Sequence, residues 1–242
     1  MAVAAHVPSA TVDTATRTPH SVSDGARYSV LRRLAPALKH DMVIDLQAVA
    51  MMAEVLNARL ERGQGSAADL QKSVSKINRL ARAAVMTCLD VAAWIEPGEA
   101  EGIRLREGVD ECVGLLAGNF NFRGFKINNE VPASDFEVSR EALRNLLCAS
   151  LMTLTDVAAA PAELSIKAEV SAGFAVLTLR VDARESDDPD ALAFAVSYRQ
   201  LDWHAIQALA VDESVELVRT TDQIVMRIPR AVATTPLQIV AV

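Results

Sequence analysis

Two long stretches with helical periodicity, separated by a short break, constrain most strongly how this chain folds. The first runs from about Ser29 to Arg62 and the second from Ser66 to about Ile95. Arg62-Gly-Gln-Gly65 interrupts the pattern, and Ser66-Ala-Ala-Asp69 has the form of a capping box that opens a helix. Two long helices joined by a short loop predict an antiparallel helical hairpin.

Each helix has an apolar stripe that needs a partner. At ~100° per residue, the stripe of the first helix lies opposite His40 and consists of Leu31, Leu38, Met42, Val49, Leu56 and Leu60. One hairpin cannot cover both stripes, so we expect a homodimer that forms a four-helix bundle. The alternative is that the stripes pack on the rest of the same chain. Pro36 predicts a kink or the true start of the first helix.

His40 points away from the apolar stripe and is followed by a carboxylate, Asp41. The carboxylate can orient the imidazole and leave the other ring nitrogen free as a nucleophile. Ile44 and Met51 lie on the same outward side, where apolar side chains around a polar centre favour a transient docking surface. On the pattern alone, an exposed histidine is more often an ordinary surface residue.

Composition excludes several classes of protein. The net charge is −7, and we find no stripe of Lys and Arg that indicates a nucleic-acid partner. No apolar run is long enough for a bilayer, and no secretion leader is recognised, so we expect a cytoplasmic protein without a membrane partner. The three cysteines are Cys88, Cys112 and Cys148; we expect them to be reduced core residues.

From residue 98 onwards the pattern changes to mixed helix and strand. We expect strands near 103–105, 125–131, 135–138, 163–170, 175–181, 215–218 and 224–228, with helices at 106–116, 139–157 and 198–211 and an acidic loop at 182–190. Helices on one side of a mixed or antiparallel sheet make an α/β sandwich. The predicted fold class is therefore α+β. It comprises a disordered tail at 1–27, the hairpin at 28–97, the sandwich at 98–231 and a second tail at 232–242.

A hairpin followed by a sandwich resembles the cytoplasmic half of two-component histidine kinases, over residues 30–230. Their phosphoacceptor motif has His, an acidic residue, an apolar residue, two variable residues, Pro and Leu. His40, Asp41, Met42 and Leu46 match it, and Asp45 stands where Pro is usual.

The second domain resembles the kinase ATP-binding domain without its nucleotide motifs. Aligning Asn145-Leu146-Leu147 with the N box puts Ala149 where the magnesium-binding Asn stands. Asp182 stands at the approach to the G1 box, but no glycine follows, and the helix at 201–209 lacks the glycines of the G2 box. Phosphate binding needs that ligand and those glycines. We therefore expect no cofactor, no metal and no autokinase activity.

What remains resembles the dimeric histidine phosphotransferases, which relay a phosphoryl group between receiver-domain aspartates and their own histidine. The resemblance implies that His40 is the phosphoacceptor, with Asp41 as its orienting partner and a response regulator receiver domain as the substrate. Arg33 and Lys39 are candidate contacts to the phosphoryl oxygens. The alternatives are a pseudokinase scaffold or inhibitor that docks on receiver or kinase domains, and a residual ATP-dependent kinase.

Overall fold

The computed structural model describes residues 19–95, 101–183 and 200–231. The chain begins with two long helices, α1 (Pro19–Glu61) and α2 (Ala67–Ile95). The second part runs β1 (Gly102–Arg104), α3 (Leu105–Phe122), β2 (Phe125–Asn129), β3 (Glu137–Ser139), α4 (Arg140–Val157), β4 (Ala162–Val170), β5 (Phe174–Ala183), α5 (Trp203–Asp212), β6 (Glu216–Arg219) and β7 (Gln223–Pro229). The predicted α+β class, with a hairpin before a sandwich, is confirmed.

The second part is a mixed sheet with helices on one face. Its strand order is β2-β4-β5-β7-β6; β2 and β4 are parallel and the other neighbours antiparallel. Along β4, β5 and β7, buried residues alternate with less buried ones, as expected when one face of a sheet carries the core. Helices α3, α4 and α5 cover that face, and β1 pairs with β3 in a small separate sheet.

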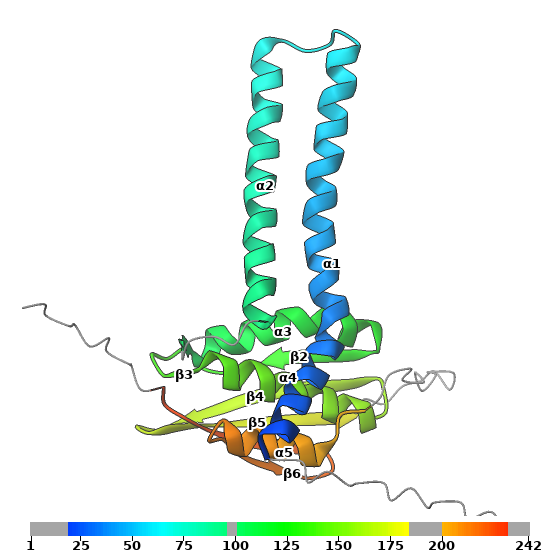
Figure 1. Cartoon of the computed structure of the whole chain (residues 1–242). Helices are drawn as coiled ribbons and strands as arrows, with labels where there is room; N and C mark the ends of the chain where they lie inside the picture. Colours follow the sequence, from blue (N-terminus) through cyan, green and yellow to red (C-terminus); the bar gives the residue numbers. More distant parts are fainter. Residues whose placement is uncertain (1–18, 96–100, 184–199, 232–242) are drawn as a thin grey trace, which may run out of the picture.

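Helices α1 and α2 form the predicted antiparallel hairpin, which projects from the α/β domain (Figure 1). The expected capping box is present at the start of α2. The Ser66 hydroxyl accepts a bond from the Asp69 N–H, and the Asp69 carboxylate accepts bonds from the Ser66 N–H and hydroxyl. These bonds satisfy backbone donors in the first turn of α2 and so stabilise the start of that helix.

The start of α1 differs from the prediction. The helix begins at Pro19 rather than near Ser29, so the later part of the expected tail is helical, while residues 1–18 lie outside the described residues. The early turns are held by a row of buried residues at helical spacing that packs on the α/β domain: Ser23, Ala26, Val30, Leu34 and Leu38. Pro36 lies inside the continuous helix.

The alternative expectation, that the apolar stripes pack on the rest of the same chain, holds for one part of the hairpin, and the homodimeric bundle stays a prediction. The first half of α1 packs on α5, α3 and α4, as the alternative stated. Beyond Leu38, α1 and α2 contact each other and leave apolar residues exposed, among them Leu46, Val85 and Leu89.

Smaller differences concern helix bounds. Helix α3 continues to Phe122, beyond the expected end at Leu116. Helix α5 begins at Trp203 rather than Tyr198, because Asp202 is its N-cap and accepts a bond from the His204 N–H. Most of the expected acidic loop lies outside the described residues. None of the described helices is long and apolar enough to span a membrane.

Candidate functional site

His40 lies on the exposed side of α1, at the point where this helix leaves the α/β domain. Leu38, two residues earlier, is the last residue of α1 that is buried against that domain. The His40 side chain is 69% exposed, and its Nδ1 lies 3.5 Å from Oδ1 of Asp41. Because Nδ1 faces the carboxylate, Nε2 is the ring nitrogen that is turned to solvent.

An apolar ridge runs along α1 from His40 towards the hairpin tip. Ile44, Met51 and Val55 follow at helical spacing and are 49%, 62% and 40% exposed. Each lies within ~60° of His40 when the helix is projected along its axis. The structure therefore brings Ile44 and Met51, both expected at the site, to the same side of the hairpin as the histidine.

The two cations expected near the phosphoryl group have different surroundings. Lys39 is exposed beside His40. Arg33 is two turns below His40 and nearly buried, and it donates two bonds to Asp156 at 2.5 and 2.9 Å. Arg123 lies 3.7 Å from the same carboxylate and donates to the Thr155 carbonyl. Arg33 thus ties α1 to the ends of α3 and α4.

Asp45, which stands where the histidine kinase motif has Pro, has a structural role of its own. The Thr87 hydroxyl of α2 donates a bond to Asp45 Oδ2 at 2.5 Å. Both groups are partly buried between the helices. This bond crosses the hairpin five residues after His40 and fixes the register of the two helices close to the histidine.

Near its start, α1 bridges α4 and α5 through one arginine. Arg27 lies 2.9 Å from Asp212 and 2.7 Å from Glu213 at the end of α5, and 3.6 Å from Glu141 at the start of α4. Burial lowers the pKa of Arg27, but the hydrogen bonds to Glu213 and Asp212 outweigh it and leave this pKa raised. Figure 1 shows this part of α1 lying across the two helices.

The residues aligned with the kinase nucleotide motifs form no ligand cluster in the structure. Ala149 is fully buried in α4. Asp182 is exposed at the end of β5 and accepts a bond from Arg180 at 2.8 Å. No group of three or more His, Cys, Asp or Glu side chains that suits a metal ion occurs in residues 19–95, 101–183 and 200–231.

The cysteines are free thiols. Cys112 and Cys148 are buried and Cys88 is half-buried. A hydrogen bond with Cys112, together with burial, raises the pKa of Cys148, so this thiol is held in its unreactive protonated form.

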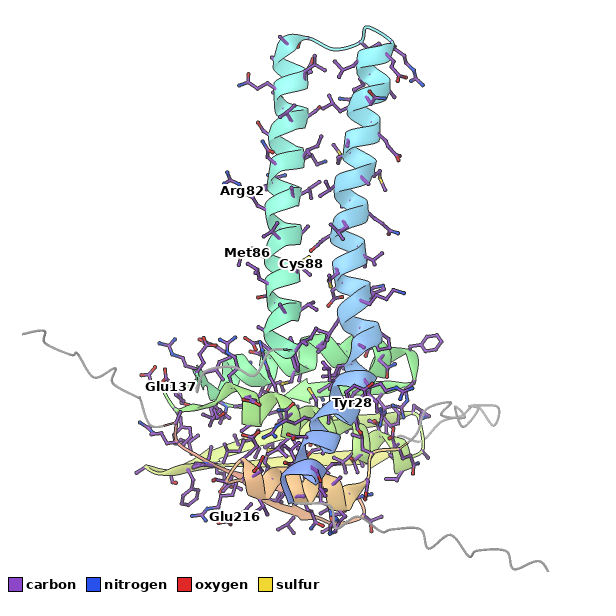
Figure 2. All side chains as sticks on the ribbon, in the orientation of Figure 1. Tyr28, Arg82, Met86, Cys88, Glu137 and Glu216 are labelled. Atoms are coloured by element: carbon purple, nitrogen blue, oxygen red, sulfur yellow. The ribbon has the colours of Figure 1, made fainter. Side chains whose placement is uncertain are left out.

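The sequence analysis missed a row of cations on α2. These residues are Lys72, Lys76, Arg79 and Arg82, all exposed. Their spacing of three to four residues was the signal that could have found them, because it places them on the outer side of one helix. Figure 2 shows Arg82 and Met86 pointing away from α1 and Cys88 pointing towards it.

No protein-family model matches the chain, and no curated protein matches its sequence. Solved structures of histidine kinases are similar to it. The kinase from Burkholderia phymatum has 14% identity over 85% of this chain and 97% of its own, with a TM-score of 0.43. The kinase AdeS of Acinetobacter baumannii has 12% identity over 76% and 96%, with a TM-score of 0.41. The kinase ThkA in complex with the response regulator TrrA has 15% identity over 91% and 69%, with a TM-score of 0.40.

Proposed function

We propose that this protein is a histidine phosphotransferase of two-component signalling that relays a phosphoryl group between receiver-domain aspartates and His40. The observation that carries the proposal is the arrangement of His40 itself. Its Nδ1 faces Asp41 at 3.5 Å, and the side chain is 69% exposed on a helix that is anchored in the α/β domain below it. A nucleophile that must meet the active site of another protein needs this accessibility and a neighbouring group that orients its ring.

The transfer step follows from the ring geometry. Nδ1 faces the Asp41 carboxylate, so in this proposal the lone pair of Nε2 attacks the phosphorus of a receiver aspartyl phosphate. The P–O bond to the aspartate breaks, the aspartate leaves as a carboxylate, and a P–N bond forms. The ring becomes a phosphoimidazolium, and its positive charge is stabilised by Asp41. Magnesium, which neutralises the phosphoryl oxygens, belongs to the receiver.

Two observations support transfer without ATP. The motif positions carry Ala149 and Asp182 but neither the metal ligand nor the glycines that phosphates require. In addition, α1 lies across α4 and α5, the two helices that resemble the N-box helix and the helix after the G2 box.

The partner of His40 in this proposal is a receiver domain that docks on the ridge of Ile44, Met51 and Val55. Lys39 is placed to meet phosphoryl oxygens, whereas Arg33 does so only if it releases Asp156. The protein acts as a homodimer in the cytoplasm. The exposed apolar residues on the opposite side of the hairpin, such as Leu46 and Leu89, support a second copy as their partner.

The second candidate is a non-catalytic scaffold or inhibitor that docks on receiver or kinase domains. The exposed apolar ridge favours it, because docking on Ile44 and Met51 does not depend on the chemistry of His40. The two candidates differ in what happens when the imidazole is replaced: a scaffold keeps its activity, and a phosphotransferase does not.

The test is phosphotransfer from a panel of phosphorylated receiver domains to the full chain. We expect an acid-labile label on the unmodified protein and none on His40→Gln. The matched control is His204→Gln, because His204 is also exposed on a helix but has no place in the proposed site. Receivers that bind but never transfer label would establish the scaffold instead. ATP titration of the full chain separates both from a residual kinase, since we expect no binding.

A further inference from the structure

The row of cations on α2 has a local charge opposite to that of the chain. Between residues 67 and 89 the chain has one acidic side chain, Asp69, and four basic ones: Lys72, Lys76, Arg79 and Arg82. That carboxylate belongs to the capping box and is hydrogen-bonded to Ser66, which lowers its pKa. The chain as a whole has a net charge of −7, so this helix concentrates positive charge in an acidic protein.

The exposed cations of the hairpin beyond Leu38 differ from most cations of the α/β domain, because they form no ion pairs within the described part of the chain. In the α/β domain most cations are paired, for example Arg104 with Glu107, Arg144 with Glu111, and Arg227 with Glu216. In the hairpin, no Lys or Arg between Lys39 and Arg82 forms an ion pair with another described residue. These charges stay available to a partner, and long-range attraction acts on unpaired charges in particular.

Helix geometry shows which side of the hairpin carries the cations. On α1 the contact line between the antiparallel helices passes through Asp45, which bonds to Thr87, and on α2 it passes through Ala84, the buried residue of that helix. Rotation by ~100° per residue puts Lys72, Lys76 and Arg79 roughly 80–140° from this contact line, on the same side of the hairpin as the His40 ridge. Arg82 is roughly 160° from the line and points away from α1 (Figure 2), so the basic row on this side consists of Lys72, Lys76 and Arg79. A shallow hollow at the tip supports this pairing of the two helices, because Arg59 of α1 lines it together with Asp69 and Lys72 of α2.

The opposite side of the hairpin has a different character. The same projection places on it four apolar side chains that are about half exposed: Leu46, Val74, Val85 and Leu89. One side therefore carries these apolar side chains, and the other combines the apolar ridge of α1 with the basic row of α2. An apolar centre with a charged margin is the composition of a transient interface.

The spacing along the hairpin suits one partner domain. Because Thr87 is level with Asp45, Arg79 is level with about residue 53 of α1 and Lys72 with about residue 60. At 1.5 Å per residue, the basic row begins roughly 20 Å and ends roughly 30 Å from His40. A domain of 100–150 residues is roughly 35 Å across, so it spans this distance with its reactive aspartate at His40.

We propose that Lys72, Lys76 and Arg79 are a recognition site for an acidic partner surface, and that the receiver which exchanges phosphoryl groups with His40 carries carboxylates roughly 20–30 Å from its own phosphoacceptor aspartate. The inference rests on the proposed function for the identity of the partner. The basic row raises the rate of association and selects among receivers, and it takes no part in the transfer step.

The test compares two double variants of the full chain that have the same net charge. Lys76→Glu with Arg79→Glu reverses the basic row. Arg82→Glu with Lys126→Glu is the matched control, because Arg82 points away from α1 (Figure 2) and Lys126 is exposed on β2. The measurements are the association rate of receivers from the panel, at low and high salt, and the transfer rate at saturating receiver.

We expect the Lys76 and Arg79 variant to associate about tenfold more slowly at low salt, and the difference to shrink at about 0.5 M salt. Its transfer rate at saturation stays that of the unmodified protein, and the control variant keeps the original association rate. Equal behaviour of the two double variants overturns the inference. So does binding of duplex DNA that the Lys76 and Arg79 variant loses while receiver association is unchanged.

The outcomes also separate this inference from the proposed function. If His40 is labelled but the association rate does not depend on the charge of the basic row, the phosphotransferase proposal stands and the recognition site is rejected. If a receiver associates at a rate that depends on these charges but His40 is never labelled, the recognition site stands and the scaffold function is favoured. If no receiver binds at all, both proposals fail.

Discussion

Glu141 is one of four carboxylates around the guanidinium of Arg27, together with Asp24, Asp212 and Glu213. Arg27 contacts Glu213 and Asp212 closely and Glu141 more distantly, at 3.6 Å. Burial raises the pKa of Glu141, repulsion from Glu213 and Asp212 adds to this, and attraction by Arg27 lowers it; the net shift is upward from 4.5. A carboxyl whose pKa is higher in the folded state stabilises the fold below its unfolded pKa, and this contribution is lost as the pH rises through its folded pKa.

At pH 7 the ionised Glu141 therefore costs stability, and Glu141→Gln removes that cost. The side chain is 40% exposed, so solvent screening keeps the expected gain in unfolding free energy to about 0.5 kcal/mol or less. Urea unfolding at pH 7 and at pH 4 measures it, and we expect the gain to disappear at the lower pH. A loss of stability at pH 7 that is absent at pH 4 would mean that the attraction to Arg27 dominates.

Single residues also show what the sequence could and could not predict. The exposure of His40 and its closeness to Asp41 follow from rotation along one helix, so periodicity alone predicted both. The ion pair of Arg33 and Asp156 joins residues 123 positions apart. Nothing local in the sequence indicates that pair, so Arg33 was predicted to contact the phosphoryl group because it lies near His40 in the sequence.

Among the elements, the hairpin has one polar contact between its two helices near His40. Thr87→Val keeps the size of the side chain but removes the hydroxyl that donates to Asp45. The carboxylate then faces a methyl group in a partly buried position. We expect the unfolding free energy to fall by about 1 kcal/mol, measured by urea unfolding. Thr87→Ser retains a donor and is the control; equal losses in the two variants would assign the effect to packing instead.

The attachment of α1 to the α/β domain depends on a carboxylate that is shared by two arginines. Asp156→Asn leaves Arg33 and Arg123, both nearly buried, without their counter-charge. We expect a loss of about 3–5 kcal/mol in unfolding free energy.

Two further variants complete that measurement. Removing one of the two arginines as well, with Arg33→Met and Asp156→Leu, should cost less than Asp156→Asn alone, because only Arg123 is then left without its counter-charge. Asp135→Asn is the surface control, since Asp135 is almost fully exposed and 3.8 Å from Arg104. If Asp156→Asn costs no more than Asp135→Asn, Asp156 does not hold α1 on the domain.

At the scale of the whole molecule, the order of elements was predictable and the course of α1 was not. Hairpin and sandwich follow from periods of 3.6 and 2 within short windows of sequence, and the capping box and the β4–β5 turn mark their ends. The first turns of α1 are fixed instead by α5, almost the whole chain away: Arg27 and Asp212 are 185 residues apart. The Ala and Ser residues of these turns give only a weak apolar periodicity. The sequence of the segment alone is therefore typical of a disordered tail, because it does not show the domain that covers it.

The exposed apolar side of the hairpin predicts how two copies of the chain assemble. Leu46, Val74, Val85 and Leu89 are each about half exposed in the single chain, and a second hairpin placed against them completes a four-helix bundle. A carboxylate in that interface would be buried without a partner, so Leu89→Glu should convert the dimer to a monomer in size-exclusion chromatography with light scattering. Met86→Glu introduces the same charge one turn away on the outward side of α2 (Figure 2) and should leave the dimer intact. Because the α/β domain has its own core, circular dichroism should show that this domain remains folded in the Leu89→Glu monomer. A wild-type chain that is monomeric at every concentration, or a dimer that both variants retain, would exclude this face as the interface.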